Sequence, residues 1–154
     1  MEDIMKLAEA LQERADLNRR IEQLKVRILN NTVVQEGEKP AEDPQELLTE
    51  LDECLEKQEE LIIKINLTNC KTIVDGRSLT ELIAQKDCLT WKLHSYRDFV
   101  NSASQLARRA TRTEIKIFST VNVKDMQKSV DKMAKELRVL DNMIQETNWK
   151  TELE

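Results

Sequence analysis

The most restrictive feature of this sequence is its shortage of the two residues that interrupt regular structure. Only two glycines and two prolines occur in 154 residues. Two glycines are too few to supply the turns of a many-stranded β fold or to build a glycine-rich phosphate loop. Apolar residues make up 40 % of the chain, which is enough for a core and argues against a disordered protein. The sequence therefore favours a folded chain with long uninterrupted elements.

Hydrophobic periodicity divides the chain into four long helical segments. They cover about residues 3–30, 43–69, 78–109 and 122–147. Asp43 before Pro44, Ser78 and Asn122 are suitable caps for the last three. Connected up-down-up-down, the segments predict an all-α fold, an antiparallel bundle of four long helices in a single domain over residues 1–154.

The second segment has the clearest amphipathic pattern. Glutamates lie opposite its apolar face, at positions typical of a solvated side. The apolar face also includes one polar residue, Gln58. Its members are Leu47, Leu48, Leu51, Cys54, Leu55, Gln58, Leu61, Ile62 and Ile65.

Two connections contain short stretches that do not follow a helical period. Residues 32–35 lie in the first connection, and Ile115 and Ile117 alternate with charged residues in the third. An up-down-up-down bundle brings these two connections to the same end. The sequence therefore predicts that residues 32–35 and 114–118 can pair as a small β-ribbon.

The third segment is apolar on two nearly opposite sides. One stripe includes Leu79, Leu82 and Leu93. A helix with two apolar sides is usually buried on both, and one four-helix domain offers few second partners. We therefore expect the second stripe to be an interface in a homo-oligomer. Its members are Ala84, Cys88, Trp91, Phe99 and Leu106.

The fourth segment carries apolar residues at alternating steps of three and four, which predicts a coiled-coil seam. Trp149, in the tail that follows, is expected to pack back onto the bundle. The seam consists of Val123, Met126, Val130, Met133, Leu137, Leu140 and Ile144.

No arrangement of residues points to catalysis, a metal or a cofactor. His94 is the one histidine, whereas helical di-iron and zinc-protease motifs each need two. Cys54, Cys70 and Cys88 are widely spaced and odd in number, which fits free thiols in a reducing compartment. Cys54 and Cys88 are interpreted as small core residues. The sequence predicts a non-enzymatic protein without cofactor or metal.

A second class of function rests on polar residues at helix ends and in loops. Together they could hold a small molecule or an anion at the loop end of the bundle. Capping, turn and helix-dipole roles are the alternative interpretation of the same residues. The candidate contacts are Asn66, Asn69, Arg77, Arg112 and Glu114.

The charge balance and hydropathy pattern exclude two further classes. The net charge is −5, so a general nucleic-acid binder is not expected. No apolar stretch approaches the roughly 20 residues that cross a bilayer, and the first residues lack the profile of a secretory signal. We expect a cytoplasmic protein without stable membrane insertion.

Several segments are distinctive in combination, although none has a chemical meaning alone. They include residues 6–11 (KLAEAL), 35–44 (QEGEKPAEDP), 65–69 (INLTN), 75–81 (DGRSLTE) and 148–153 (NWKTEL). Together they resemble the septicolysin-like family of small bacterial helical proteins, over nearly the whole chain. The resemblance implies a bacterial, cytosolic protein and transfers no catalytic residue. The family's name adds a third function, a cytolysin acting on membranes.

Overall fold

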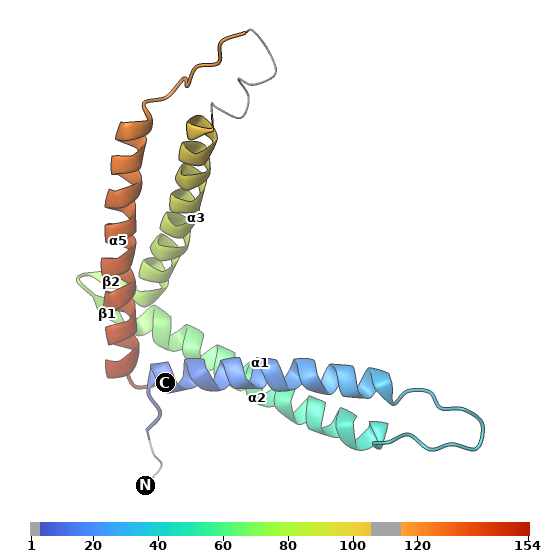
Figure 1. The fold of residues 1–154 in the computed structure, drawn as a ribbon. Coiled ribbons are helices and arrows are strands. Elements are labelled where there is room, and N and C mark those ends of the chain that lie inside the picture. The colour runs from blue at the N-terminus through green and yellow to red at the C-terminus, as the bar shows by residue number, and fades with distance from the viewer. Residues whose placement is uncertain (1–3, 106–114) are drawn as a thin grey trace. The chain divides into compact units, whose positions relative to one another are not determined.

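A computed structural model of the chain describes residues 4–105 and 115–154 (Figure 1). The described residues form four long helices, α1 (Leu7–Asn30), α2 (Pro44–Lys71), α3 (Leu79–Ser104) and α5 (Val123–Lys150), and two short strands, β1 (Ile73–Val74) and β2 (Arg77–Ser78). The predicted all-α fold of four long helices with a small ribbon is confirmed. The chain divides into two compact units, one of residues 1–78 and 147–154 and one of residues 79–146.

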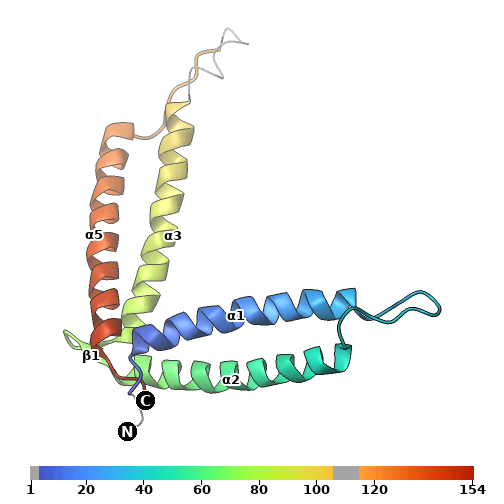
Figure 2. The ribbon, with the colours of Figure 1, turned by 60° about the horizontal axis from the view of Figure 1, so that its bottom comes forward.

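The first unit is built on the antiparallel pair of α1 and α2, which Figure 2 shows side by side. Leu24 of α1 and Ile65 of α2 are almost fully buried in this unit. At the loop end, the Arg27 guanidinium bonds to the carboxylate of Glu42, and that of Arg20 bonds to Glu50 across the pair. Apolar burial holds the pair together, and these ion pairs fix its register along one side.

Two of the predicted helix caps, those of α2 and α5, are present where the sequence places them. Asp43 accepts a hydrogen bond from the backbone N–H of Gln45 at 2.9 Å, and Pro44 is the first residue of α2. Asn122 accepts one from the N–H of Asp125 at 3.1 Å. Each cap pairs an N–H group that a helix start would otherwise leave without a partner.

The last residues return to the start of α1. The N–H of Leu7 donates to the Thr151 carbonyl and the N–H of Leu153 donates to the Met5 carbonyl, both at 2.9 Å. Lys6 and Glu152 form an isolated antiparallel bridge. The residues after α5 therefore fold back through their backbone, whereas Trp149, which was predicted to pack onto the bundle, lies within α5 and is 53 % exposed.

The second unit is the helical pair of α3 and α5 (Figure 1). Leu93 and Val100 of α3 and Val130 and Met133 of α5 form its buried core, against which Leu137 also packs. The Lys86 ammonium contacts the Asp141 carboxylate at 2.7 Å. Five of the seven residues of the predicted seam therefore lie on the face that α5 turns toward α3, namely Val123, Met126, Val130, Met133 and Leu137.

The β-ribbon forms at a different place from the one predicted. β1 and β2 pair antiparallel in the second connection, with Val74 opposite Arg77. Residues 32–35 and 115–118 are not strands, and Glu114 lies outside the described residues. Asp75 and Gly76 both have positive φ, as a two-residue hairpin turn requires. This local turn closes easily, whereas pairing the first and third connections requires closure of a much longer loop.

Candidate functional site

The apolar stripe of α3 that we predicted as an interface lies on the exposed side of the helix. Ala84 and Cys88 are exposed, Trp91 is 80 % exposed and Phe99 is 54 % exposed. The opposite side of α3 carries the buried Leu93. Leu106 lies outside the described residues. The interpretation of Cys88 as a core residue was wrong, since its side chain is on this exposed side.

Small side chains lie on one side of the exposed tryptophan, and Asp87 and His94 lie on the other. Cys88 precedes Trp91 by three residues and Ser95 follows it by four, so both lie beside it on the helix. Phe99 is at the edge of this face, where its ring centroid lies 6.2 Å from that of Tyr96. Trp91 therefore stands above a low surface, which we call the tryptophan face (Ala84, Cys88, Trp91, Ser95).

A pocket of about 340 Å³ lies beyond the end of this face, between α3 and the segment before α5. Phe99 and Ala103 line one side of it, and residues 117–121 line the other. Phe118 in that segment is 75 % exposed, as is Ile115 two residues before the lining begins. This part of the second unit exposes aromatic and branched apolar side chains to solvent.

The predicted anion contacts are not shown as one site. Asn66 is exposed and Asn69 half-buried in α2, and Arg77 is exposed in β2, where it has interactions of its own. Arg112 and Glu114 lie outside the described residues. The anion-binding role of these five residues stays a prediction.

Polar side chains are buried at three positions in the first unit. Thr68, 2 % exposed, donates to the Lys64 carbonyl and accepts a 3.0 Å hydrogen bond from the N–H of Glu154. Asn148 and Gln58 are also buried, and the side-chain amide oxygen of each has no hydrogen-bond partner among the described residues. Thr68 and Asn148 lie near the carboxyl ends of α2 and α5, and because both are buried, their polar atoms need hydrogen-bond partners within the protein.

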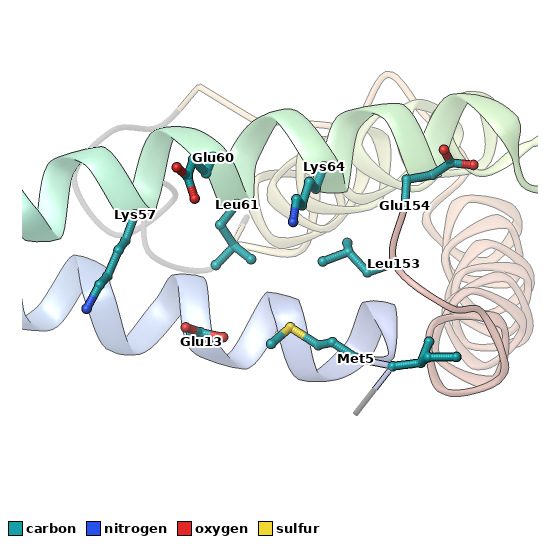
Figure 3. A pocket seen from close by; sticks show the side chains of 9 residues that line it. Met5, Glu13, Lys57, Glu60, Leu61, Lys64, Leu153 and Glu154 are labelled. Atoms are coloured by element: carbon teal, nitrogen blue, oxygen red, sulfur yellow. The ribbon is translucent and has the colours of Figure 1, made fainter. Parts of the chain in front are cut away.

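The first unit also has an open groove of about 590 Å³ between α1, α2 and the tail. Figure 3 shows Leu61 and Lys64 of α2 and Leu153 of the tail directed into it, with Glu13 on the α1 side. Charged lining residues of both signs, two lysines and three glutamates, leave the groove without strong selectivity for an anion or a cation. Sequence reasoning missed this groove because Glu13 and Lys57 become neighbours only through the register of the helix pair.

Two ion pairs shift the protonation of their carboxyl groups. The hydrogen bond from Arg27 lowers the pKa of Glu42, and the same contact raises the pKa of Arg27. The hydrogen bond from Lys86 lowers the pKa of Asp141. The Arg27–Glu42 pair joins a helix to a loop, and the Lys86–Asp141 pair joins two helices. These pKa shifts therefore reflect contacts that hold the fold together.

The described residues show no further sign of reaction chemistry. Within them no group of three or more histidine, cysteine or acidic side chains has the geometry of a metal site. In the part of the chain that the structure describes, none of Cys54, Cys70 and Cys88 forms a disulfide bond. No helix in the described part of the chain combines the length and hydropathy needed to span a bilayer.

Comparison with known proteins gives two findings. The chain is similar to a functionally unknown conserved protein from Corynebacterium diphtheriae whose crystal structure has been solved. Their identity is 38 %, the TM-score is 0.94, and the match covers 99 % of this chain and 100 % of that one. No curated protein sequence matches. A family model, described as a family of unknown function (DUF6847), matches residues 14–153, so the chain belongs to the DUF6847 family.

Proposed function

We propose that this protein is a non-enzymatic, cytoplasmic helical protein that self-associates and acts through its surfaces. The observation that carries the proposal is the 80 % exposure of Trp91 on the outward side of α3. Tryptophan is highly buried on average in folded proteins and is enriched at protein interfaces. A tryptophan this exposed is therefore typical of a surface that a partner covers.

A second copy of the chain is the partner that best fits the tryptophan face. The small side chains of Cys88 and Ser95 beside Trp91 leave a shallow surface on which the indole ring of another copy can lie. A face that combines a projecting ring with such a surface is self-complementary, as two-fold symmetric interfaces require. The support for self-association is thus the pattern of large and small residues on one helix face.

The test is the molar mass of the Trp91→Glu variant by light scattering. Burying an unpaired carboxylate in an interface is costly, so we expect a smaller particle than the wild type. Val139→Glu is the matched control, because Val139 is also exposed, at 53 %, but lies on α5. Circular dichroism should show equal helix content in both variants. A wild-type protein that is monomeric at micromolar concentration would contradict the proposal.

A membrane-directed role is the second candidate function. The septicolysin-like resemblance supports it, as does the 75 % exposure of Ile115 and Phe118, three residues apart in the segment before α5. Exposed apolar side chains of this kind can enter the interfacial region of a bilayer. Dye release from lipid vesicles tests this role, with Phe118→Ser expected to reduce leakage. Vesicles that stay intact at high protein concentration would remove it.

A further inference from the structure

The two sides of the α1–α2 pair are lined by different kinds of side chain. The residues of α2 that face α1 recur at alternating steps of four and three, and all are buried or half-buried. These inward residues are Leu47, Leu51, Cys54, Gln58, Leu61, Ile65 and Thr68. On one side of this line lie the ion pairs of Arg20 with Glu50 and Arg27 with Glu42. We call that side the ion-paired flank; toward the tail the same side opens into the groove lined by Glu13, Lys57 and Lys64.

The opposite side of the inward line, the open flank, is apolar and exposed. Leu48, Leu55 and Ile62 of α2 lie there, seven residues apart and 39 %, 45 % and 37 % exposed. At 1.5 Å per residue they form a stripe about 21 Å long. A seven-residue apolar repeat next to a packed seam is the pattern by which a helix contacts a second neighbour.

A polar pair joins the inward line to the open flank. The side-chain amide of the buried Gln58 donates to the amide oxygen of the exposed Asn18 at 2.6 Å. Among the described residues the Asn18 amide nitrogen has no acceptor. Asn18 therefore presents an unused hydrogen-bond donor on the open flank.

The two outer edges of the open flank differ in charge. The α2 edge carries the exposed carboxylates of Asp52, Glu56 and Glu59. On the α1 edge the charges of Glu22 and Lys25 cancel, and Arg19 pairs with Asp16 of its own helix. Two acidic α2 edges repel each other, so two copies meet more favourably α2 to α1.

We propose that the open flank is the interface between two copies of this chain, in which α2 of each copy packs antiparallel against α1 of the other. The two hairpins then form a four-helix bundle in which every helix has antiparallel neighbours. This proposal rests on the proposed self-association and assigns a second surface to it.

The arrangement matches the open flank level by level. The register of the pair places Leu11 level with Ile62, Asn18 level with Leu55, and Lys25 level with Leu48. A copy related by an axis along the helices repeats the Leu11–Ile62 layer and places its Asn18 at the level of Leu55. The stem of its Lys25 covers Leu48 while the ammonium remains at the edge.

The first experiment compares Leu55→Asp with Leu67→Asp by sedimentation equilibrium. Leu67 is an equally suitable exposed leucine of α2, at 48 %, but lies on another side of the helix. We expect Leu55→Asp to raise the dissociation constant of the complex by about tenfold or more, because it places a carboxylate in an apolar layer. Leu67→Asp should leave it unchanged. Equal effects of the two variants would overturn the proposal.

The second experiment tests the pairing of α2 with α1. Asp52→Lys should weaken the complex by about two- to fivefold, and Lys25→Glu in the same chain should restore part of the loss. If α2 instead packed on α2, Asp52→Lys would remove a like-charge contact and tighten the complex. A tighter complex would therefore contradict the arrangement.

The two faces are distinguished by comparing Leu55→Asp with Trp91→Glu. A monomeric wild type contradicts both proposals. An oligomer weakened by Trp91→Glu but not by Leu55→Asp supports the tryptophan face as the interface and contradicts the open flank. An oligomer weakened by Leu55→Asp alone supports the open flank and removes the tryptophan face. Two partial losses, one from each variant, support both.

Discussion

At the scale of single residues, the first unit depends on a few buried polar contacts between segments distant in sequence. Thr68 is the clearest case, because its hydroxyl bonds within α2 and also accepts the N–H of Glu154. Lys71 adds an ion pair with the Glu154 carboxylate at 2.7 Å. Exposed ion pairs contribute little, so the buried hydroxyl is the stronger link between α2 and the tail.

Thr68→Val should therefore destabilise the protein by about 1 kcal/mol, the net value of a typical buried hydrogen bond and its unmet partner. Urea unfolding followed by circular dichroism measures the change. Thr49→Val is the control, because Thr49 makes the same hydrogen bond to the carbonyl four residues earlier, at 3.0 Å, but is exposed. Equal losses in the two variants would show that the tail contact contributes nothing.

At the scale of elements, local signals predicted helix ends well and predicted packing less well. Asp43 and Asn122 act within a few residues, so their caps could be identified from sequence. In α2, however, the sequence groups Leu55 and Leu61 in one apolar face, whereas the structure leaves the first 45 % exposed and the second 7 %. A pattern indicates which residues share a side but not how much of that side one neighbour covers.

The pairing of α3 with α5 gives a pH prediction. The hydrogen bond from Lys86 holds the pKa of Asp141 below its usual value of 3.8. A lowered native pKa means that the stabilisation is present above that usual value and is lost as the pH falls through the native pKa. In Lys86→Met the pKa of Asp141 should rise toward 3.8, and acid should destabilise the pair less. An NMR titration of the Asp141 carboxyl carbon checks this, and an unchanged midpoint would contradict it.

At the scale of the whole molecule, each compact unit has its own buried core. Leu24 is fully buried in the first unit and Leu93 is 3 % exposed in the second. The sequence predicted the helices but placed the ribbon wrongly, and it located neither the division into units nor the groove beside Glu13. These features depend on contacts between residues far apart in sequence, which no local periodicity records.

Leu24→Ala and Leu93→Ala test the independence of the two units. Each should cost about 2–5 kcal/mol, because each removes fully buried side-chain volume. Hydrogen exchange read by mass spectrometry should show faster exchange mainly in α1 and α2 for Leu24→Ala and mainly in α3 and α5 for Leu93→Ala. Uniform loss of protection in both units by either variant would show that they unfold together.

The tail that pairs with residues 5–7 has a consequence for the order of folding during synthesis. The second unit is one continuous stretch of chain, residues 79–146, whereas the first needs residues 147–154 to be complete. During synthesis, α1 and α2 therefore emerge from the ribosome long before the segment that bonds to Met5 and Leu7. The first unit is thus the first to be synthesised and the last to be completed. Part of its apolar surface stays exposed until residues 147–154 have been translated.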